Sequence, residues 1–190
     1  MSIEIPPSKL YAEQTLTYIL NKLRNHDQIV KNLLELKGDG WRKMKYARGL
    51  FDRRIGFLSA NEVNKELIAL IEPFHCEVKT CSQLLYDELS GKYQIEHVGE
   101  KELFELCDII VVQGDAEDYK SGLTAEYINS IKNEALLILA TDDVAIDEGA
   151  IVENLKAERI NAVVSDTLSF AKDVAGTVNV LIAKQSIDNK

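Results

Sequence analysis

The sequence predicts an α/β fold, a doubly wound parallel sheet of about seven strands preceded by an N-terminal helical arm. Three observations support this prediction. Short runs that are apolar on nearly every residue recur between residues 55 and 183, as in strands buried on both faces. Stretches with apolar residues three and four positions apart fall between several of these runs, as in helices. The chain of 190 residues is long enough for one well-buried core and too short for two full domains.

The N-terminal segment has a helical pattern from Ser8 to Leu36, with leucine, isoleucine and valine at spacings of three, four and seven. Gly38 follows as a stop signal, and Asn25 and its neighbours are expected to bend or break the helix midway. A helix of this length would span about 40 Å at 1.5 Å per residue, more than one small domain covers. We therefore expect residues 1–40 to form an arm that packs against a second copy in a homodimer. The alternative is that the arm folds back on its own sheet.

Residues 41–190 alternate between the two patterns and are expected to form the α/β domain. The strand-like runs are Ile55–Ser59, Glu77–Cys81, Ile95–Val98, Ile109–Gln113, Leu136–Ala140, Ala162–Ser165 and Val178–Ala183. The helix-like runs between several of them are Asn61–Glu72, Glu100–Cys107, Thr124–Lys132 and Asp147–Glu158. Strands and helices at this spacing imply βαβ crossovers, which build a parallel sheet with helices on both faces.

Charge and composition exclude several classes of partner. The chain has 22 Lys and Arg residues against 31 Asp and Glu, a formal net charge of -9 and a pI of about 4.9. Such an acidic surface repels phosphate backbones and anionic lipids, so no nucleic acid and no membrane partner is expected. No apolar run approaches the ~20 residues of a membrane span. The three cysteines form no CxxC pair, which indicates reduced thiols and a cytoplasmic protein.

The stretch RRIGFLSANEVNKELIALI, residues 53–71, has the strand, turn and helix of a dinucleotide-binding site without its glycines. In such sites one glycine permits the tight turn, a second lets the backbone approach the pyrophosphate, and a third lets helix and strand pack closely. Here the turn offers Ser59, Asn61 and Asn64. An acidic residue about 20 positions on normally binds the ribose, and none stands near Ser82, where the next strand ends. The stretch is either an ordinary strand-turn-helix without a ligand, or a modified phosphate site that uses free amides at a helix N-terminus.

Acidic residues gather after two of the predicted strands. They are Asp115, Glu117, Asp118, Asp142, Asp143, Asp147 and Glu148. Ligand sites of open α/β sheets lie at the carboxyl ends of strands, and carboxylates there can bind a divalent cation or a cationic molecule. Alternatively, Asp147 and Glu148 only favour the start of a helix, and the other acids are solvated loop charges. The histidines lie too far apart in the pattern to form a metal cluster, and no metal is expected.

One long stretch carries a specific resemblance, residues 103–166, LFELCDIIVVQGDAEDYKSGLTAEYINSIKNEALLILATDDVAIDEGAIVENLKAERINAVVSD. It is similar to the D-isomer-specific 2-hydroxyacid dehydrogenases. In register with that family's pattern stand Asp108, Gly122, Leu123, Lys132, Asp147, Glu148, Ala150, Leu155 and Asp166. The register continues back through Ile55–Gly56 to YAEQTLTYILNKLRN, so the resemblance covers about residues 10–185. It implies a degenerate NAD-binding domain of this family, with a Rossmann-like sheet of seven parallel strands and an N-terminal dimerisation arm.

The resemblance also implies a role for each position of the site, and most of these positions have changed. The three fingerprint glycines correspond to Ser59, Asn61 and Asn64, the ribose-binding acid to Ser82, the substrate-binding arginine to Asp142, the acid that orients the catalytic histidine to Ala171, and that histidine to Gln185. Gly56 is retained, and so is Asp166, which in the family contacts the nicotinamide amide.

These changes predict a catalytically inactive protein. A carboxylate at Asp142 repels an anionic 2-hydroxy acid. Gln185 forms hydrogen bonds but cannot exchange a proton near neutral pH, a loss of about 10²–10⁴ in rate. The first hypothesis is therefore a dimeric binding or regulatory module whose degenerate NAD site holds no NAD or binds it weakly. The second is an NAD-binding component of a D-2-hydroxyacid dehydrogenase, an oxidoreductase that another chain or domain completes.

Overall fold

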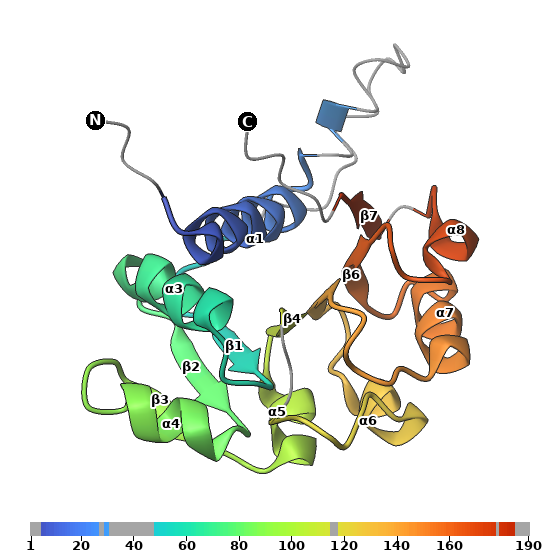
Figure 1. Ribbon diagram of the computed structural model, residues 1–190. Coiled ribbons are helices and arrows are strands. Elements are labelled where there is room, and N and C mark those ends of the chain that lie inside the picture. Colours follow the sequence, from blue (N-terminus) through green and yellow to red (C-terminus); the bar gives the residue numbers. More distant parts are fainter. Residues whose placement is uncertain (1–4, 27–28, 31–47, 115–117, 178, 185–190) are drawn as a thin grey trace.

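Seven parallel strands form one sheet in the computed structural model, which describes residues 5–26, 29–30, 48–114, 118–177 and 179–184 (Figure 1). The strands are β1 (Arg54–Phe57), β2 (Glu77–Thr80), β3 (Ile95–His97), β4 (Ile109–Gln113), β5 (Leu136–Ala140), β6 (Asn161–Ser165) and β7 (Val180–Ala183). Their order across the sheet is β3-β2-β1-β4-β5-β6-β7, so the chain winds outward from β1 on one side and from β4 on the other. The prediction of a doubly wound parallel sheet is confirmed.

Helices cover both faces of this sheet. One face carries α1 (Pro7–Leu23), α3 (Glu62–Ile71) and α4 (Gln83–Leu89), and the single turn η2 (Glu72–Phe74) follows α3. The other face carries α5 (Glu100–Leu106), α6 (Ala125–Ser130), α7 (Glu148–Lys156) and α8 (Ala171–Val174). The sequence pattern does not predict α4 and α8, because seven and four residues are too few to show a helical period. None of the helices in the described part of the chain has the length and apolar character needed to cross a bilayer.

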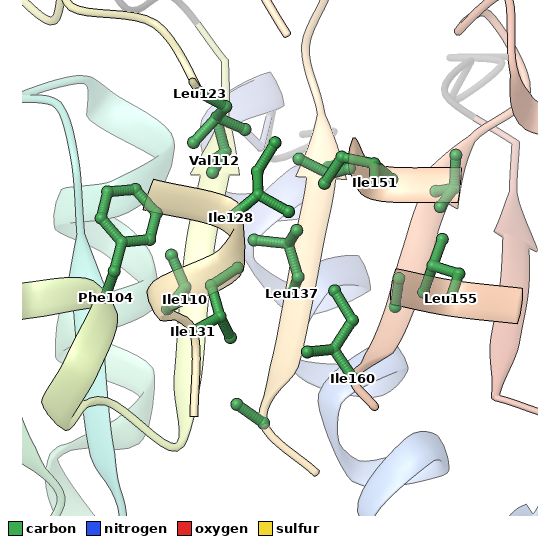
Figure 2. Close-up of a cluster of buried hydrophobic side chains, with 14 of the residues drawn as sticks. Phe104, Ile110, Val112, Leu123, Ile128, Ile131, Leu137, Ile151, Leu155 and Ile160 are labelled. Atoms are coloured by element: carbon green, nitrogen blue, oxygen red, sulfur yellow. The ribbon is translucent and has the colours of Figure 1, made fainter. Parts of the chain in front are cut away.

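A separate hydrophobic core fills each face, and β4 and β5 contribute to both. Ile110, Val112 and Leu137 belong to the core under α5, α6 and α7, where Figure 2 shows them among the side chains of those helices. Ile109 and Val111 belong to the core under α1 and α3. All five residues of β4 are buried, which explains why this strand is apolar almost throughout rather than on alternate residues.

The N-terminal helix ends at the break that the sequence predicts. α1 ends at Leu23, and Asn25 has φ 52°, a left-handed conformation that interrupts the helix where the sequence predicts a bend. The buried residues of α1 are Ala12, Thr15, Ile19 and Lys22. The helix lies beside α3, and Ala12 and Ile19 join the core of that face (Figure 1). The described part of the arm therefore folds back on its own sheet, as in the alternative, and the break predicted at Asn25 is confirmed. The predicted stop at Gly38 lies outside the described residues.

Asp108 ties three elements together at the edge of the sheet where the strands begin. Its carboxylate accepts hydrogen bonds from the Arg54 backbone N–H (3.1 Å) and from Lys132 Nζ (2.6 Å), just after α6. The Arg53 guanidinium lies 3.7 Å away. Burial by itself would raise the pKa of Asp108, but these donors and positive charges outweigh burial and lower the pKa below its usual value.

The substitution Asp108→Asn is expected to lower the free energy of unfolding by about 1–3 kcal/mol at neutral pH, because charged hydrogen bonds are lost at a mostly buried site. The folded carboxyl has a lowered pKa, so its stabilisation is present above the unfolded pKa of about 3.9 and is lost as the pH falls through the folded pKa. In urea unfolding, the free energy of unfolding of the variant should therefore be lower than that of the unmodified protein by a constant amount between about pH 5 and 7. This difference should become smaller below about pH 4. The exposed Asp87→Asn is the control and should change stability by less than about 0.5 kcal/mol. A deficit that grows on acidification would contradict this account.

Gly56 lies inside β1, where α5 crosses the strand closely. A Cβ at this position would lie 2.6 Å from Leu103 Cδ2 and 2.9 Å from Cys107 Sγ, closer than real Cβ contacts allow. The missing side chain therefore sets the spacing between β1 and α5, and the glycine has a packing role.

We expect Gly56→Ala to destabilise the protein by about 1–3 kcal/mol, as other overpacking substitutions do. Gly91→Ala is the matched control, because an added Cβ there meets nothing within 4 Å. Thermal unfolding followed by circular dichroism compares the two variants. Equal melting temperatures of the two variants would contradict this prediction, because they would show that β1 and α5 move apart without loss of stability.

Candidate functional site

The turn between β1 and α3 lies at the carboxyl ends of the strands, where ligands bind in open α/β sheets. Asn61 is the N-cap of α3, and its backbone is extended (φ -130°, ψ 164°) rather than left-handed. Its side-chain oxygen accepts from the Asn64 N–H (2.8 Å), and its amide donates to the Gln113 carbonyl oxygen (2.8 Å) and to Ser59 Oγ (3.1 Å). The Asn61 side chain thus caps α3 and also links the turn after β1 to the end of β4.

Asn64 continues this arrangement into the core. The residue is 0% exposed, and its amide donates to the Ser59 carbonyl oxygen at 2.9 Å. Its side-chain oxygen accepts from Gln113 Nε2 at 3.1 Å, and Gln113 Oε1 in turn accepts from the Thr15 hydroxyl at 2.5 Å. We call these five residues (Thr15, Ser59, Asn61, Asn64 and Gln113) the turn network. It links α1, β4, α3 and the turn through buried hydrogen bonds.

Asp118 closes the outer side of the turn. Its carboxylate oxygens lie 3.1 and 3.0 Å from the Ala60 backbone N–H, which donates to them. The Ser82 hydroxyl also donates to this carboxylate. Ser82 is the N-cap of α4 and accepts from the Leu85 N–H (3.1 Å). One carboxylate therefore bridges the turn after β1 and the turn after β2.

Sequence reasoning identified Ser59, Asn61, Asn64 and Ser82 but missed the partners that hold them. Gln113 carried a usable signal, since it is a polar residue at the end of an otherwise apolar buried strand. Nothing in the sequence indicated the contacts of Asp118 beyond its place among the loop acids, because these contacts depend on the path of the loop in three dimensions.

Of the three positions that correspond to the family's catalytic residues, the structure describes Asp142 and Ala171. Asp142 is exposed and accepts from the Thr167 hydroxyl (2.9 Å). Ala171 is a buried core residue at the start of α8. Gln185 lies outside the described residues. Asp166 follows β6 and is exposed. Gly56 faces α5, so the structure gives it a packing contact rather than a place in the crevice.

The acidic loops do not form a metal site in the described part of the chain, where no three His, Cys, Asp or Glu residues lie close enough to hold an ion. Asp147 caps α7 by accepting from the Ala150 N–H (3.0 Å), and Glu148 accepts from the Ser169 hydroxyl. These two acids therefore have the helix-start role that the sequence left open.

A cavity of about 390 Å³ remains open beside the turn network. It lies between α1 and the residues at and just beyond the ends of β4, β5, β6 and β7. Tyr11 and Tyr18 line it from α1, and Asp142 and Asp143 line it after β5.

Comparison with known proteins agrees with this architecture. The chain matches the family model described as D-isomer specific 2-hydroxyacid dehydrogenase, NAD binding domain, over residues 16–178. No curated protein matches the chain.

Several solved structures share the fold. A phosphoglycerate oxidoreductase from Rhizobium etli matches with a TM-score of 0.79 and 18% identity, over 94% of this chain and 59% of that one. The NAD complex of a D-isomer specific 2-hydroxyacid dehydrogenase from Lactobacillus delbrueckii ssp. bulgaricus matches with a TM-score of 0.78 and 15% identity, over 97% and 61%. An acyclic imino acid reductase in complex with NADPH and D-Arg matches with a TM-score of 0.77 and 21% identity, over 94% and 58%.

The chain thus spans about three-fifths of the length of these structures. At such identities they show a shared fold, whereas the family model matches most of the chain directly. The chain belongs to the NAD-binding domain family of the D-isomer specific 2-hydroxyacid dehydrogenases.

Proposed function

We propose that this protein is a catalytically inactive relative of the dehydrogenases, a binding or regulatory module whose dinucleotide site is filled by its own side chains. The observation that carries the proposal is the position of Asp118. Its carboxylate accepts from the Ala60 N–H of the turn and from the Ser82 hydroxyl, so an internal anion uses donors at the place where the family binds its cofactor.

A pyrophosphate would meet three obstacles at this turn. It would have to displace the carboxylate of Asp118 or lie beside its negative charge. The Asn61 side chain already accepts from the Asn64 N–H, so that amide is not free for a phosphate oxygen. The Cβ of Asn61 also lies where the fingerprint requires a glycine, so that the backbone can approach the pyrophosphate closely. These obstacles support a site that holds no dinucleotide or holds it weakly.

The loss of the family's catalytic groups supports the same proposal. Ala171 is buried against the core and has no acidic group to orient a base. Asp142 places a negative charge where the family's substrate is anionic. Gln185 replaces the residue that exchanges the proton, and an amide does not titrate near neutral pH.

A second function remains a candidate, that of an NAD-binding component completed by another chain or domain. Two observations favour it. The family to which the chain belongs is described by its NAD-binding domain. Asp166, which follows β6, is retained, and its charge acts on Tyr18 of α1. The two functions differ in one measurable property, namely whether the chain binds NADH.

Titration with NADH and NAD⁺ is expected to give no saturable rise in melting temperature at millimolar cofactor. A ligand at a hundred times its dissociation constant would stabilise the fold by about 2.7 kcal/mol, which is readily detected. Asp118→Ala and the double variant Asn61→Gly/Asp118→Ala should gain a measurable shift, because they free the turn amides and remove a Cβ. Asp87→Ala, an exposed acid on α4, is the control for charge. A saturable shift with the unmodified protein would replace this proposal by the second function.

We also propose that the protein is a homodimer formed through its N-terminal segment. The support is apolar exposure at either end of the described part of this segment, where Ile5 is 51% and Val30 41% exposed. Isolated exposed side chains of this size are common, so the proposal rests on the pair and on the family's dimerisation arm.

Light scattering after gel filtration is expected to give twice the chain mass of 21.3 kDa. The double substitution Ile5→Glu/Val30→Glu should yield the monomer, because it places charges in an apolar contact. Leu84→Glu on α4 is the matched control, since Leu84 is 50% exposed and remote from the segment in sequence. A monomeric mass for the unmodified protein would rule the dimer out.

A further inference from the structure

The cavity beside α1 has an apolar body and a charged rim. Ile138 and Val163 line its interior from the central strands. Tyr11 and Tyr18 on α1 contribute aromatic rings. Its volume of about 390 Å³ lies at the lower end of the range for small-molecule sites, about 300–1,000 Å³. This is room for a molecule of roughly one ring with a short side chain.

The rim of the cavity is predominantly negative. Asp142 and Asp143 line it, both exposed, and Lys184 is the one cation among the lining residues. Asp166 adds a further negative charge near the α1 wall. Burial raises the pKa of the Tyr18 phenol, the Gln14 amide opposes this rise, and the charge of Asp166 adds to it. An anionic ligand would therefore be repelled at the rim, and a cationic one attracted.

Thr141 supplies a directional group inside the cavity. The residue is only 3% exposed and lines the cavity wall. Its hydroxyl oxygen accepts from the Asp143 N–H (3.1 Å), and its own proton has no acceptor among the described residues. A buried hydroxyl in this state is best satisfied by an acceptor atom on a ligand.

We propose that this cavity binds a small organic amine whose apolar body carries a hydrogen-bond acceptor. The carboxylates of Asp142 and Asp143 hold the ammonium group, the tyrosine rings and aliphatic strand residues hold the body, and Thr141 donates to the acceptor. A metal ion does not fit, because a hard cation needs several oxygen ligands and no such group exists among the described residues. The proposal rests on the binding function proposed above and names the chemical class of its ligand.

Three probes with the same phenol ring and different head groups test the proposal. They are tyramine (a cation), tyrosol (neutral) and 3-(4-hydroxyphenyl)propanoate (an anion). Calorimetric titration of the full chain should show saturable binding of tyramine, at least about tenfold weaker binding of tyrosol, and none of the anion, since a charged hydrogen bond accounts for about a tenfold difference. Equal binding of all three, or no binding of tyramine, would overturn the proposal.

Substitutions locate the site. Asp142→Asn/Asp143→Asn should weaken tyramine about tenfold or more and leave tyrosol unchanged, because asparagine keeps the shape and removes the charge. Glu102→Gln/Glu105→Gln on α5 removes two exposed charges on the opposite face and should leave both affinities unchanged. Unchanged tyramine affinity in the first variant would overturn the assignment to this cavity. NADH titrated into the same samples separates the two proposals, since NADH binding contradicts the inactive module while absence of amine binding contradicts only the ligand class.

Discussion

A chain of buried hydrogen bonds at the carboxyl ends of β1 and β4 fixes the geometry of the crevice. It runs from Thr15 on α1 through Gln113 at the end of β4 to Asn64 in α3. A buried polar group that loses its partner costs about 1–3 kcal/mol, so these side chains depend on one another. These hydrogen bonds therefore hold α1 and α3 in one position over the sheet. It also places the α1 wall of the open cavity, which makes that cavity a consequence of the turn network.

The same bonds determine which end of the crevice can accept a ligand. At the β1 turn, the amides and hydroxyls that a phosphate would use already have partners in Asn61 and Asp118. Beyond β5, Asp142 and Asp143 line an open volume, and the Asp142 carboxylate accepts from the Thr167 hydroxyl. Under the two proposals, binding moves from the anion end of the crevice to the end whose acids suit a cation.

Strands that are buried on both faces are apolar on nearly every residue, so the composition of these short runs was enough to predict the sheet. The helices α4 and α8 escaped prediction because they are too short for a helical period to develop. The break after α1 was predictable because asparagine tolerates the left-handed conformation that Asn25 adopts. The altered turn was predictable because Ser59, Asn61 and Asn64 stand where glycine is required. The contact of Asp118 with Ala60 was not, since it joins residues 58 positions apart through the fold of a loop. Gly56 was placed with the cofactor residues, whereas its empty side-chain position accommodates Leu103.

The positions that agree with the family pattern and those that depart from it differ in their physical role. Asp108 and Lys132 pair across the edge of the sheet where the strands begin. Gly122 has φ 73°, and a Cβ there would lie 2.9 Å from the Ala145 carbonyl oxygen, so its presence is dictated by the backbone path into α6. These matches are explained by folding alone. The departures, from Ser59 to Asp142, lie at the opposite edge, where the strands end and the family binds its cofactor. A chain that merely decayed would lose packing residues as readily as site residues. Here three of the altered side chains, Ser59, Asn61 and Asn64, are bonded to one another. Such mutual bonding supports the proposal that the fold is kept while the dinucleotide site is filled by the protein's own side chains.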